Sequence, residues 1–202
     1  AIHVELTWET PGDPDETDSG PVAGSDLDLH FAHPNASGPD LDVNGIEDPW
    51  FDKDWDAFWY NKAPNWGSFD PSAGDDPSLD RDDTDGAGPE NLNMGIPEDD
   101  ILYHIGVHYW DSHGLGPATT TVRVWTYATL IYEGCAGKTE EECCLSPAEG
   151  GAVCEVLEAP LNELDMWCVG AVNWPDPEVA TCAPLAPDTV TTNYVNPFFL
   201  SF

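Results

Sequence analysis

Positive charge is nearly absent from this chain. Its 202 residues hold 5 Lys and Arg against 39 Asp and Glu, so the formal net charge is −34 at pH 7. A chain of this charge repels the phosphates of nucleic acids and the headgroups of anionic membranes. We therefore expect no nucleic-acid partner, and cations are the partners that the charge favours.

Long apolar runs and enzyme signatures are also missing. No stretch approaches the roughly 18–20 consecutive apolar residues that a membrane-spanning helix needs, so membrane insertion is not predicted. The sequence contains no GxSxG, HExxH or P-loop motif. Carboxylates are so abundant that a hydrolase with a carboxylate pair stays open as a hypothesis, but no particular pair stands out. We expect a protein that is not an enzyme.

Cysteine is absent from the first two thirds of the chain. The cysteines are Cys135, Cys143, Cys144, Cys154, Cys168 and Cys182. An even number without the CxxC pairs of zinc sites favours disulfides and an oxidising, extracellular compartment. We expect one bridge between Cys168 and Cys182, and expect the other four cysteines to staple an insert at 134–160. A secreted protein of this sequence would be the mature chain, after removal of a signal peptide.

Alternating apolar and polar residues dominate what is present. The pattern runs through residues 2–8, 26–33, 57–61, 101–110, 119–133, 166–174 and 189–200. Short alternating segments between turn-rich loops are typical of antiparallel sheets with one buried face. We predict an all-β fold: one domain over 1–202, built as an antiparallel β-sandwich of jelly-roll or immunoglobulin-like type. It would carry long Asp-rich loops, an acidic insert at 36–56 and a C-terminal tail strand at 183–202.

One short helix is expected within the Cys-rich insert. Thr139 is a suitable N-cap for a helix over 140–145, and three glutamates follow it in the first turn. The positive end of the helix dipole favours acidic residues there.

The sharpest local motif is DLDVNGIED at 40–48. Oxygen-bearing side chains stand at alternate positions, Gly45 permits a sharp turn, and another aspartate follows. Alternate side chains of a curled loop converge on one ion, as in calcium-binding loops. Phe51 stands where an EF-hand carries Glu, so the motif resembles instead the Asp-rich calcium loops of thrombospondin type-3 repeats. The expected ligands are Asp40, Asp42, Asn44, Asp48 and Asp52.

A second acidic loop, SLDRDDTDGAGPEN, occupies 78–91. Its candidate calcium ligands are Asp80, Asp82, Asp85 and Glu90, with Arg81 as the one local cation. Crowded like charges cost stability unless something neutralises them. Asp26 and Asp28 lie about 7 Å apart on one face of the strand 26–33, and a cation between that strand and this loop would relieve their repulsion. A weaker third candidate is GDPDETDSG at 12–20, through Asp13, Asp15 and Asp18.

Several motifs together resemble the YfaP-like domain, a secreted bacterial module of uncharacterised function. They are ELTW, DLDLHFAHP, FWYN, LDRDDTDGAGPENL and YHIGVHYW, and the likeness covers about residues 2–132. The resemblance implies a β-sandwich and an extracytoplasmic setting, without a settled activity. The chain departs from that pattern in the acidic insert, in the Cys-rich insert and beyond residue 175.

These patterns favour an extracellular calcium-binding structural protein with several Ca²⁺ ions. We expect it to assemble with copies of itself into a filament or lattice at the cell surface. The apolar end of the chain, TVTTNYVNPFFLSF, would either complete its own sandwich or add to a neighbouring copy. An alternative is a carbohydrate-binding or adhesion module, in which tryptophans of the segment 48–66 stack on a polysaccharide.

Overall fold

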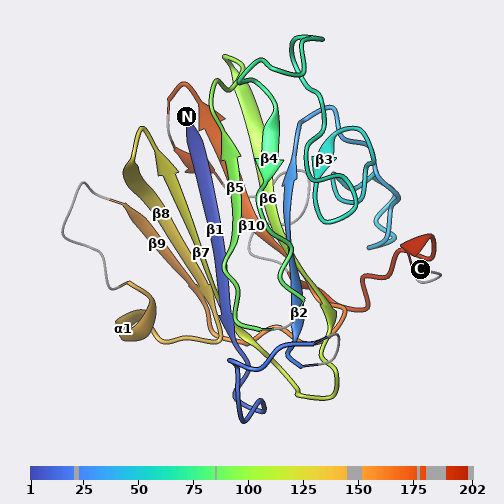
Figure 1. Ribbon diagram of the computed structural model, residues 1–202, viewed down its shortest axis with the longest axis vertical. Helices are drawn as coiled ribbons and strands as arrows, with labels where there is room; N and C mark the ends of the chain where they lie inside the picture. Colours follow the sequence, from blue (N-terminus) through green and yellow to red (C-terminus); the bar gives the residue numbers. More distant parts are fainter. Residues whose placement is uncertain (21–22, 85, 145–151, 177, 181–189, 200–202) are drawn as a thin grey trace.

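The computed structural model describes residues 1–20, 23–84, 86–144, 152–176, 178–180 and 190–199 (Figure 1). Its strands are β1 Ile2–Glu9, β2 Asp26–Ala32, β3 Asp56–Ala57, β4 Pro77–Leu79, β5 Glu90–Met94, β6 Ile101–Asp111, β7 Thr119–Thr126, β8 Thr129–Ala136, β9 Val153–Leu157, β10 Met166–Trp174, β11 Val179–Ala180 and β12 Val190–Thr191. The helix α1 spans Glu140–Cys143. None of the helical segments described has the length and apolarity to traverse a bilayer.

The strands form two sheets that pack face to face, which confirms the predicted β-sandwich. Sheet A has the order β4-β5-β1-β7-β8-β9, and sheet B has the order β11-β10-β6-β2-β3, with β12 added against β10. Neighbouring strands run antiparallel, with β8 and β9 as the parallel exception. The main core lies between the sheets and draws on both.

Alternation explains how the strands bury one face. In β1 the side chains of Ile2, Val4, Leu6 and Trp8 are buried, while the intervening polar residues lie on the outer face of sheet A. Successive side chains of a strand point to opposite faces, so one apolar stripe is enough to hold β1 at the centre of its sheet.

The structure divides the predicted strand 119–133 into a hairpin. Strands β7 and β8 meet at Tyr127 and Ala128, whose φ angles are 49° and 63°. Two consecutive residues with positive φ form the tight turn that matches the twist of a hairpin. The prediction of one continuous strand was wrong because neither residue is a typical turn former.

Other strand boundaries were also wrong. Of the predicted strand 57–61, only Ala57 belongs to a strand, and Phe58 and Asn61 form an isolated bridge. Of 189–200, the described residues pair only at Val190–Thr191. Strands β4, β5 and β9 were missed because they are short and two of them lie at sheet edges, where polar residues interrupt the apolar pattern.

Disulfides staple the Cys-rich insert to sheet A, as predicted. Cys135 on β8 is bonded to Cys143 of α1, and Cys144 is bonded to Cys154 on β9. Cys168 is also disulfide-bonded, and its expected partner, Cys182, lies outside the described residues. Thr139 caps α1 as predicted, and the Oε2 atom of Glu142 accepts hydrogen bonds from both the backbone N–H and the hydroxyl of Thr139. The helix ends at Cys143, and Leu145 lies outside the described part.

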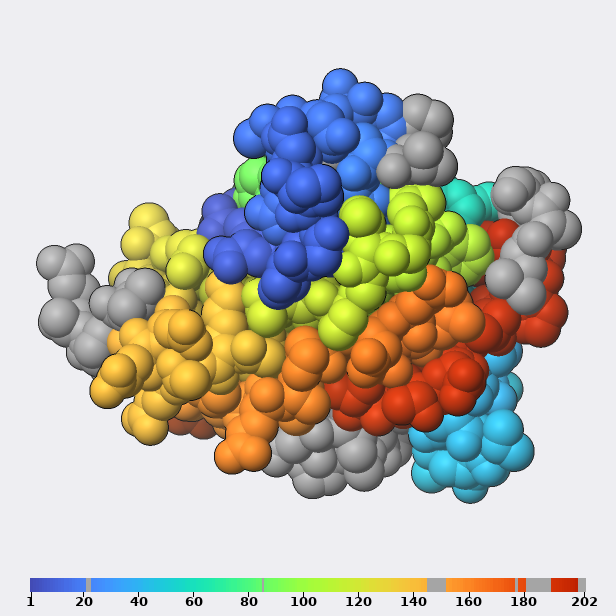
Figure 2. Space-filling model, turned by 90° about the horizontal axis from the view of Figure 1, so that it is seen from below, coloured from blue at the N-terminus to red at the C-terminus, as the bar shows by residue number. Residues whose placement is uncertain are grey.

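The C-terminal segment packs on its own chain. Tyr194 and Phe199 are buried in a second core beside Phe51, with ring centroids 6.0 Å and 5.5 Å from that ring. The Nε2 atom of His108 lies 2.9 Å from the carbonyl oxygen of Tyr194. Figure 2 shows the red C-terminal segment beside the cyan residues of the acidic insert. The sequence left open whether this segment packs on its own chain or on a neighbouring copy. In the described residues it packs on its own chain.

Candidate metal centres

Three carboxylates converge where the two sheets meet. Asp28 lies on β2 of sheet B, Glu90 opens β5 of sheet A, and Asp82 lies in the connection between β4 and β5. One oxygen from each lies within 4.8 Å of the others. We call these three residues the inter-sheet site.

Glu90 already ties the two sheets together through backbone hydrogen bonds. Its Oε2 atom accepts the N–H of Leu29 at 2.8 Å, and its Oε1 atom accepts the N–H of Asp83 at 3.0 Å. Leu29 offers this N–H because β3 pairs with β2 only at Phe31 and Ala32, which leaves that edge open nearby. The carboxylate of Glu90 therefore sits against the open edge of β2, within reach of Asp28.

Burial makes this cluster electrostatically costly. Asp28 is 3% exposed and Glu90 is fully buried. Loss of solvent, and then the neighbouring carboxylates, raise the pKa of Asp28 well above its usual range; loss of solvent also raises that of Glu90, against two backbone hydrogen bonds that lower it. Burial and the Asp82 carboxylate raise the pKa of nearby Asp26 to about 7. These raised pKa values mean that ionisation of the buried acids is unfavourable unless a further positive charge lies close to them.

The nearby basic side chains offset this cost only in part: the charge of Lys62 lowers the pKa of Asp28, but less than burial and the neighbouring carboxylates raise it. Lys62 pairs with Asp82 at 3.1 Å and Arg81 pairs with Asp83 at 2.9 Å, and about half of each basic side chain is exposed to solvent. Within the described residues no Lys or Arg forms an ion pair with Asp28 or Glu90. The Oδ2 atom of Asp28 is buried without a hydrogen-bond partner. An oxygen-seeking cation would satisfy it.

A second group of carboxylates lies in the connection between β2 and β3. Oxygens of Asp40, Asp42 and Asp48 lie within 4.8 Å of one another, and we call these three residues the loop site. The Oδ1 and Oδ2 atoms of Asp40 accept the N–H groups of Asn44 and Gly45 at 3.1 Å and 2.9 Å. Gly45 has φ +89°, a conformation that glycine adopts freely, so the loop can curl around its own carboxylates.

Asp48 connects the loop site to the C-terminal segment. Its Oδ2 atom accepts the N–H of Leu41 at 2.8 Å and the hydroxyl of Tyr194 at 2.7 Å. Its Oδ1 atom is buried without a hydrogen-bond partner. Burial raises the pKa of Asp48, although both hydrogen bonds oppose the shift. Asn44 donates its side-chain N–H to Asp42 at 2.7 Å, so its amide oxygen, which accepts the N–H of Ile46, is the oxygen it can offer to an ion.

The structure does not bring Asp52 or Asp80 into these groups. The Oδ1 atom of Asp52 accepts the N–H groups of Asp54 and Trp55, and its Oδ2 atom accepts that of Ser37. The Oδ2 atom of Asp80 accepts the side-chain amide of Asn93 at 2.8 Å. Asp52 therefore stabilises the conformation of its loop, and Asp80 binds a side chain of β5. Asp85 lies outside the described residues.

The third predicted loop uses its acids in local turns. The Oδ1 atom of Asp13 accepts the N–H of Asp15, and the Oδ1 atom of Asp15 accepts both the N–H and the hydroxyl of Thr17. Asp15 and Asp18 are exposed. Among the described residues, Asp13, Asp15 and Asp18 form no convergent group, since the groups found lie elsewhere.

The tryptophan-rich segment 48–66 does not present a row of exposed rings. Trp50 and Trp66 are 0% and 1% exposed and belong to the two cores, while Trp55 and Trp59 are half-buried. A half-buried tryptophan that sequence reasoning passed over, Trp125, lines a hollow on the outer face of sheet A. The alternation along β7 could have indicated this position. Val124 and Thr126 are buried, so Trp125 between them lies on the opposite, outer face.

Comparisons with family models, with curated proteins and with solved structures find no match to this chain. The resemblance to the YfaP-like domain stays a prediction, and the functional argument depends on the geometry of the sites.

Proposed function

We propose that this chain is an extracellular calcium-binding structural protein. Ca²⁺ at the inter-sheet site would link sheet A to sheet B, and a second ion at the loop site would fix the connection between β2 and β3. The observation that carries the proposal is the unpartnered, buried Oδ2 atom of Asp28, beside the carboxylates of Asp82 and Glu90. A buried charge without a partner costs more than any single hydrogen bond returns.

The donor atoms favour calcium over transition metals. Both sites offer carboxylate oxygens, and neither contains His or Cys. Asn44, in the same loop as the loop site, carries an amide oxygen that could add to its ligands. Hard cations select oxygen ligands, and calcium accepts the irregular arrangements that loops provide. Each Ca²⁺ would also offset two of the 34 negative charges in excess.

The disulfides support an extracellular setting. Two of them join the described cysteines of the Cys-rich insert, and such bonds persist in oxidising compartments. Extracellular calcium-binding modules commonly have dissociation constants of about 10⁻⁴–10⁻³ M, which suits sites built from few ligands. Assembly into a filament or lattice is part of the proposal, because calcium would reduce the repulsion between copies. Sedimentation with and without calcium measures that assembly.

A calorimetric calcium titration tests the inter-sheet site. We expect the wild type to bind at least two ions, and Asp28→Asn to bind one fewer, because the amide removes one charged ligand with little change in shape. Asp99→Asn is the matched control: it makes the same chemical change at an exposed aspartate outside both sites. Wild-type stoichiometry in Asp28→Asn, or no binding by any variant, would refute the proposal.

A further inference from the structure

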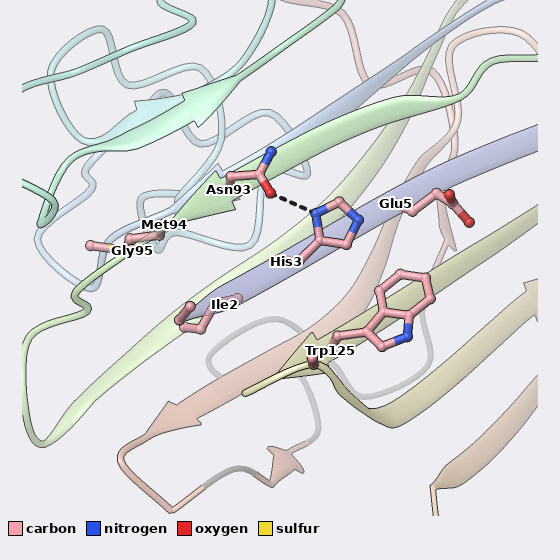
Figure 3. A pocket seen from close by; sticks show the side chains of 9 residues that line it. Ile2, His3, Glu5, Asn93, Met94, Gly95 and Trp125 are labelled. Atoms are coloured by element: carbon pink, nitrogen blue, oxygen red, sulfur yellow. Dashed lines mark hydrogen bonds between the residues drawn. The ribbon is translucent and has the colours of Figure 1, made fainter. Parts of the chain in front are cut away.

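The outer face of sheet A carries a hollow of about 610 Å³ over its inner strands, at the end of the sheet where β1 begins and β5 and β7 end. It is lined by His3 and Glu5 of β1, Asn93 and Met94 of β5, and Trp125 of β7 (Figure 3). Ligand-binding hollows of this size are usually apolar with a few placed polar groups. His3, Glu5, Asn93 and Trp125 lie on hydrogen-bonded strands, which hold side chains more rigidly than loops do.

Trp125 and His3 form the floor of this hollow together. They are direct cross-strand partners, and their rings lie 5.1 Å apart at an interplanar angle of 42°. The pairing of β7 with β8 shifts register between Val124 and Trp125. Such bulges re-aim a side chain and are common beside functional sites.

A chain of hydrogen bonds determines which nitrogen of His3 carries the proton. The Nδ2 atom of Asn93 donates to the carboxylate of Asp80 at 2.8 Å, so the Oδ1 atom of Asn93 faces His3. The Nδ1 atom of His3 lies 2.8 Å from that oxygen and must donate to it. In neutral His3 the Nε2 atom is then an acceptor of hydrogen bonds.

Glu5 supplies a second fixed acceptor. Its Oε1 atom pairs with Arg123 at 3.3 Å, and Arg123 is itself held by Glu133 at 2.8 Å. Glu5 lines the same hollow, and the described contacts of its carboxylate engage Oε1, so Oε2 can accept a further hydrogen bond. The hollow thus combines an aromatic surface with two oriented acceptors.

We propose that this hollow binds a neutral glycan. A pyranose ring with equatorial hydroxyls has apolar faces that can stack on Trp125, and its rim of hydroxyls can donate to His3 and Glu5. The net charge of −34 disfavours acidic sugars. An extended peptide is a poorer fit, because added strands need a free sheet edge and β1 lies between β5 and β7. Glycan binding in this hollow does not depend on calcium, so the glycan proposal and the calcium proposal can fail separately.

Cellohexaose, a neutral chain of equatorially substituted glucose units, is the probe. Binding is measured by calorimetry and by tryptophan fluorescence of the folded protein, in calcium and in EGTA. We expect Trp125→Ala to weaken binding at least about tenfold, as loss of an aromatic stacking contact does in other ligands. His3→Ala, a change on the outer face of sheet A, should weaken binding about fivefold, the loss of one hydrogen bond.

Phe69→Ala is the matched control, since Phe69 is a fully exposed aromatic side chain outside the hollow. Its affinity should equal that of the wild type, and hexagalacturonate, an acidic oligosaccharide, should not bind. Three results would overturn the proposal. They are no binding of cellohexaose at millimolar concentration, wild-type affinity for cellohexaose in both the Trp125→Ala and the His3→Ala variant, and binding of hexagalacturonate as tightly as cellohexaose.

Discussion

The two groups of carboxylates differ in how far apart their members lie along the chain. The loop site comes from nine consecutive residues, 40–48, whereas the inter-sheet site joins Asp28 to Asp82 and Glu90. A contiguous motif retains some affinity for calcium in the unfolded chain, and binding to the unfolded state reduces the stabilisation that an ion gives. Distant ligands meet only when both sheets have formed. The inter-sheet site should therefore contribute more to stability, whichever site binds more tightly.

Calcium removal should give the largest effect. At calcium concentrations a hundredfold above the dissociation constant, one site adds about 2.7 kcal/mol to the free energy of unfolding, or roughly 5–10 °C in Tm for a domain of this size. We expect Asp28→Asn to lose most of the calcium-dependent increase in Tm and Asp42→Asn to lose a smaller part, in thermal melts with calcium or EGTA. Equal losses would contradict the distinction between the sites.

The pH dependence of the calcium-free protein should be the next largest effect. A pKa raised by folding, as for Asp26 at about 7, contributes stability at low pH that is lost as pH rises through that value. Burial instead lowers the pKa of His33, His104 and His108, whose destabilising effect is confined to pH below about 6.5.

Between pH 6.5 and 8 the raised acids dominate the titration difference between the two states, because the main shifted group that opposes them is the α-amino group of Ala1, whose pKa burial lowers from its usual value of about 8.0. In EGTA we expect the free energy of unfolding, and with it Tm, to fall over this window. The fall is up to about 1.4 kcal/mol per pH unit for each proton that the chain takes up on folding. Calcium should reduce that fall, because the ion stabilises the ionised carboxylates. Thermal melts at three pH values measure it, and a Tm that rises with pH in EGTA would show that the acids do not behave as buried groups.

Tyr194→Phe should give the smallest effect and separates the two sites. It removes the hydroxyl that donates to Asp48 while keeping the ring in the second core. We expect the free energy of unfolding to fall by about 0.5–1.5 kcal/mol, the usual net contribution of one hydrogen bond. Calorimetry should show weaker binding at the loop site and an unchanged inter-sheet site. A change at both sites would mean that they are coupled through the fold.

Much of the fold could be predicted from alternation alone. The alternation in β1, β2, β6 and β10 identifies them as strands, and the sandwich follows because apolar sheet faces must cover each other. Alternation alone predicts one buried face, which holds for β1, whereas β2, β6 and β10 are buried on both faces. The turn at Tyr127 and the short strands at sheet edges could not be predicted, because their conformations depend on the neighbours with which they pair rather than on their own residues.

The sequence by itself determined the local features: the alternating strands, the 40–48 motif with its glycine, the capped helix and the insert held by disulfides. Only the tertiary structure decided that Asp28 and Glu90 meet, that Asp52 and Asp80 serve backbone and amide groups instead, and that Trp125 lines the hollow while Trp50 and Trp66 are buried. The physical reason is that periodicity specifies which face a side chain occupies, but strand order and pairing register specify which distant residues share that place.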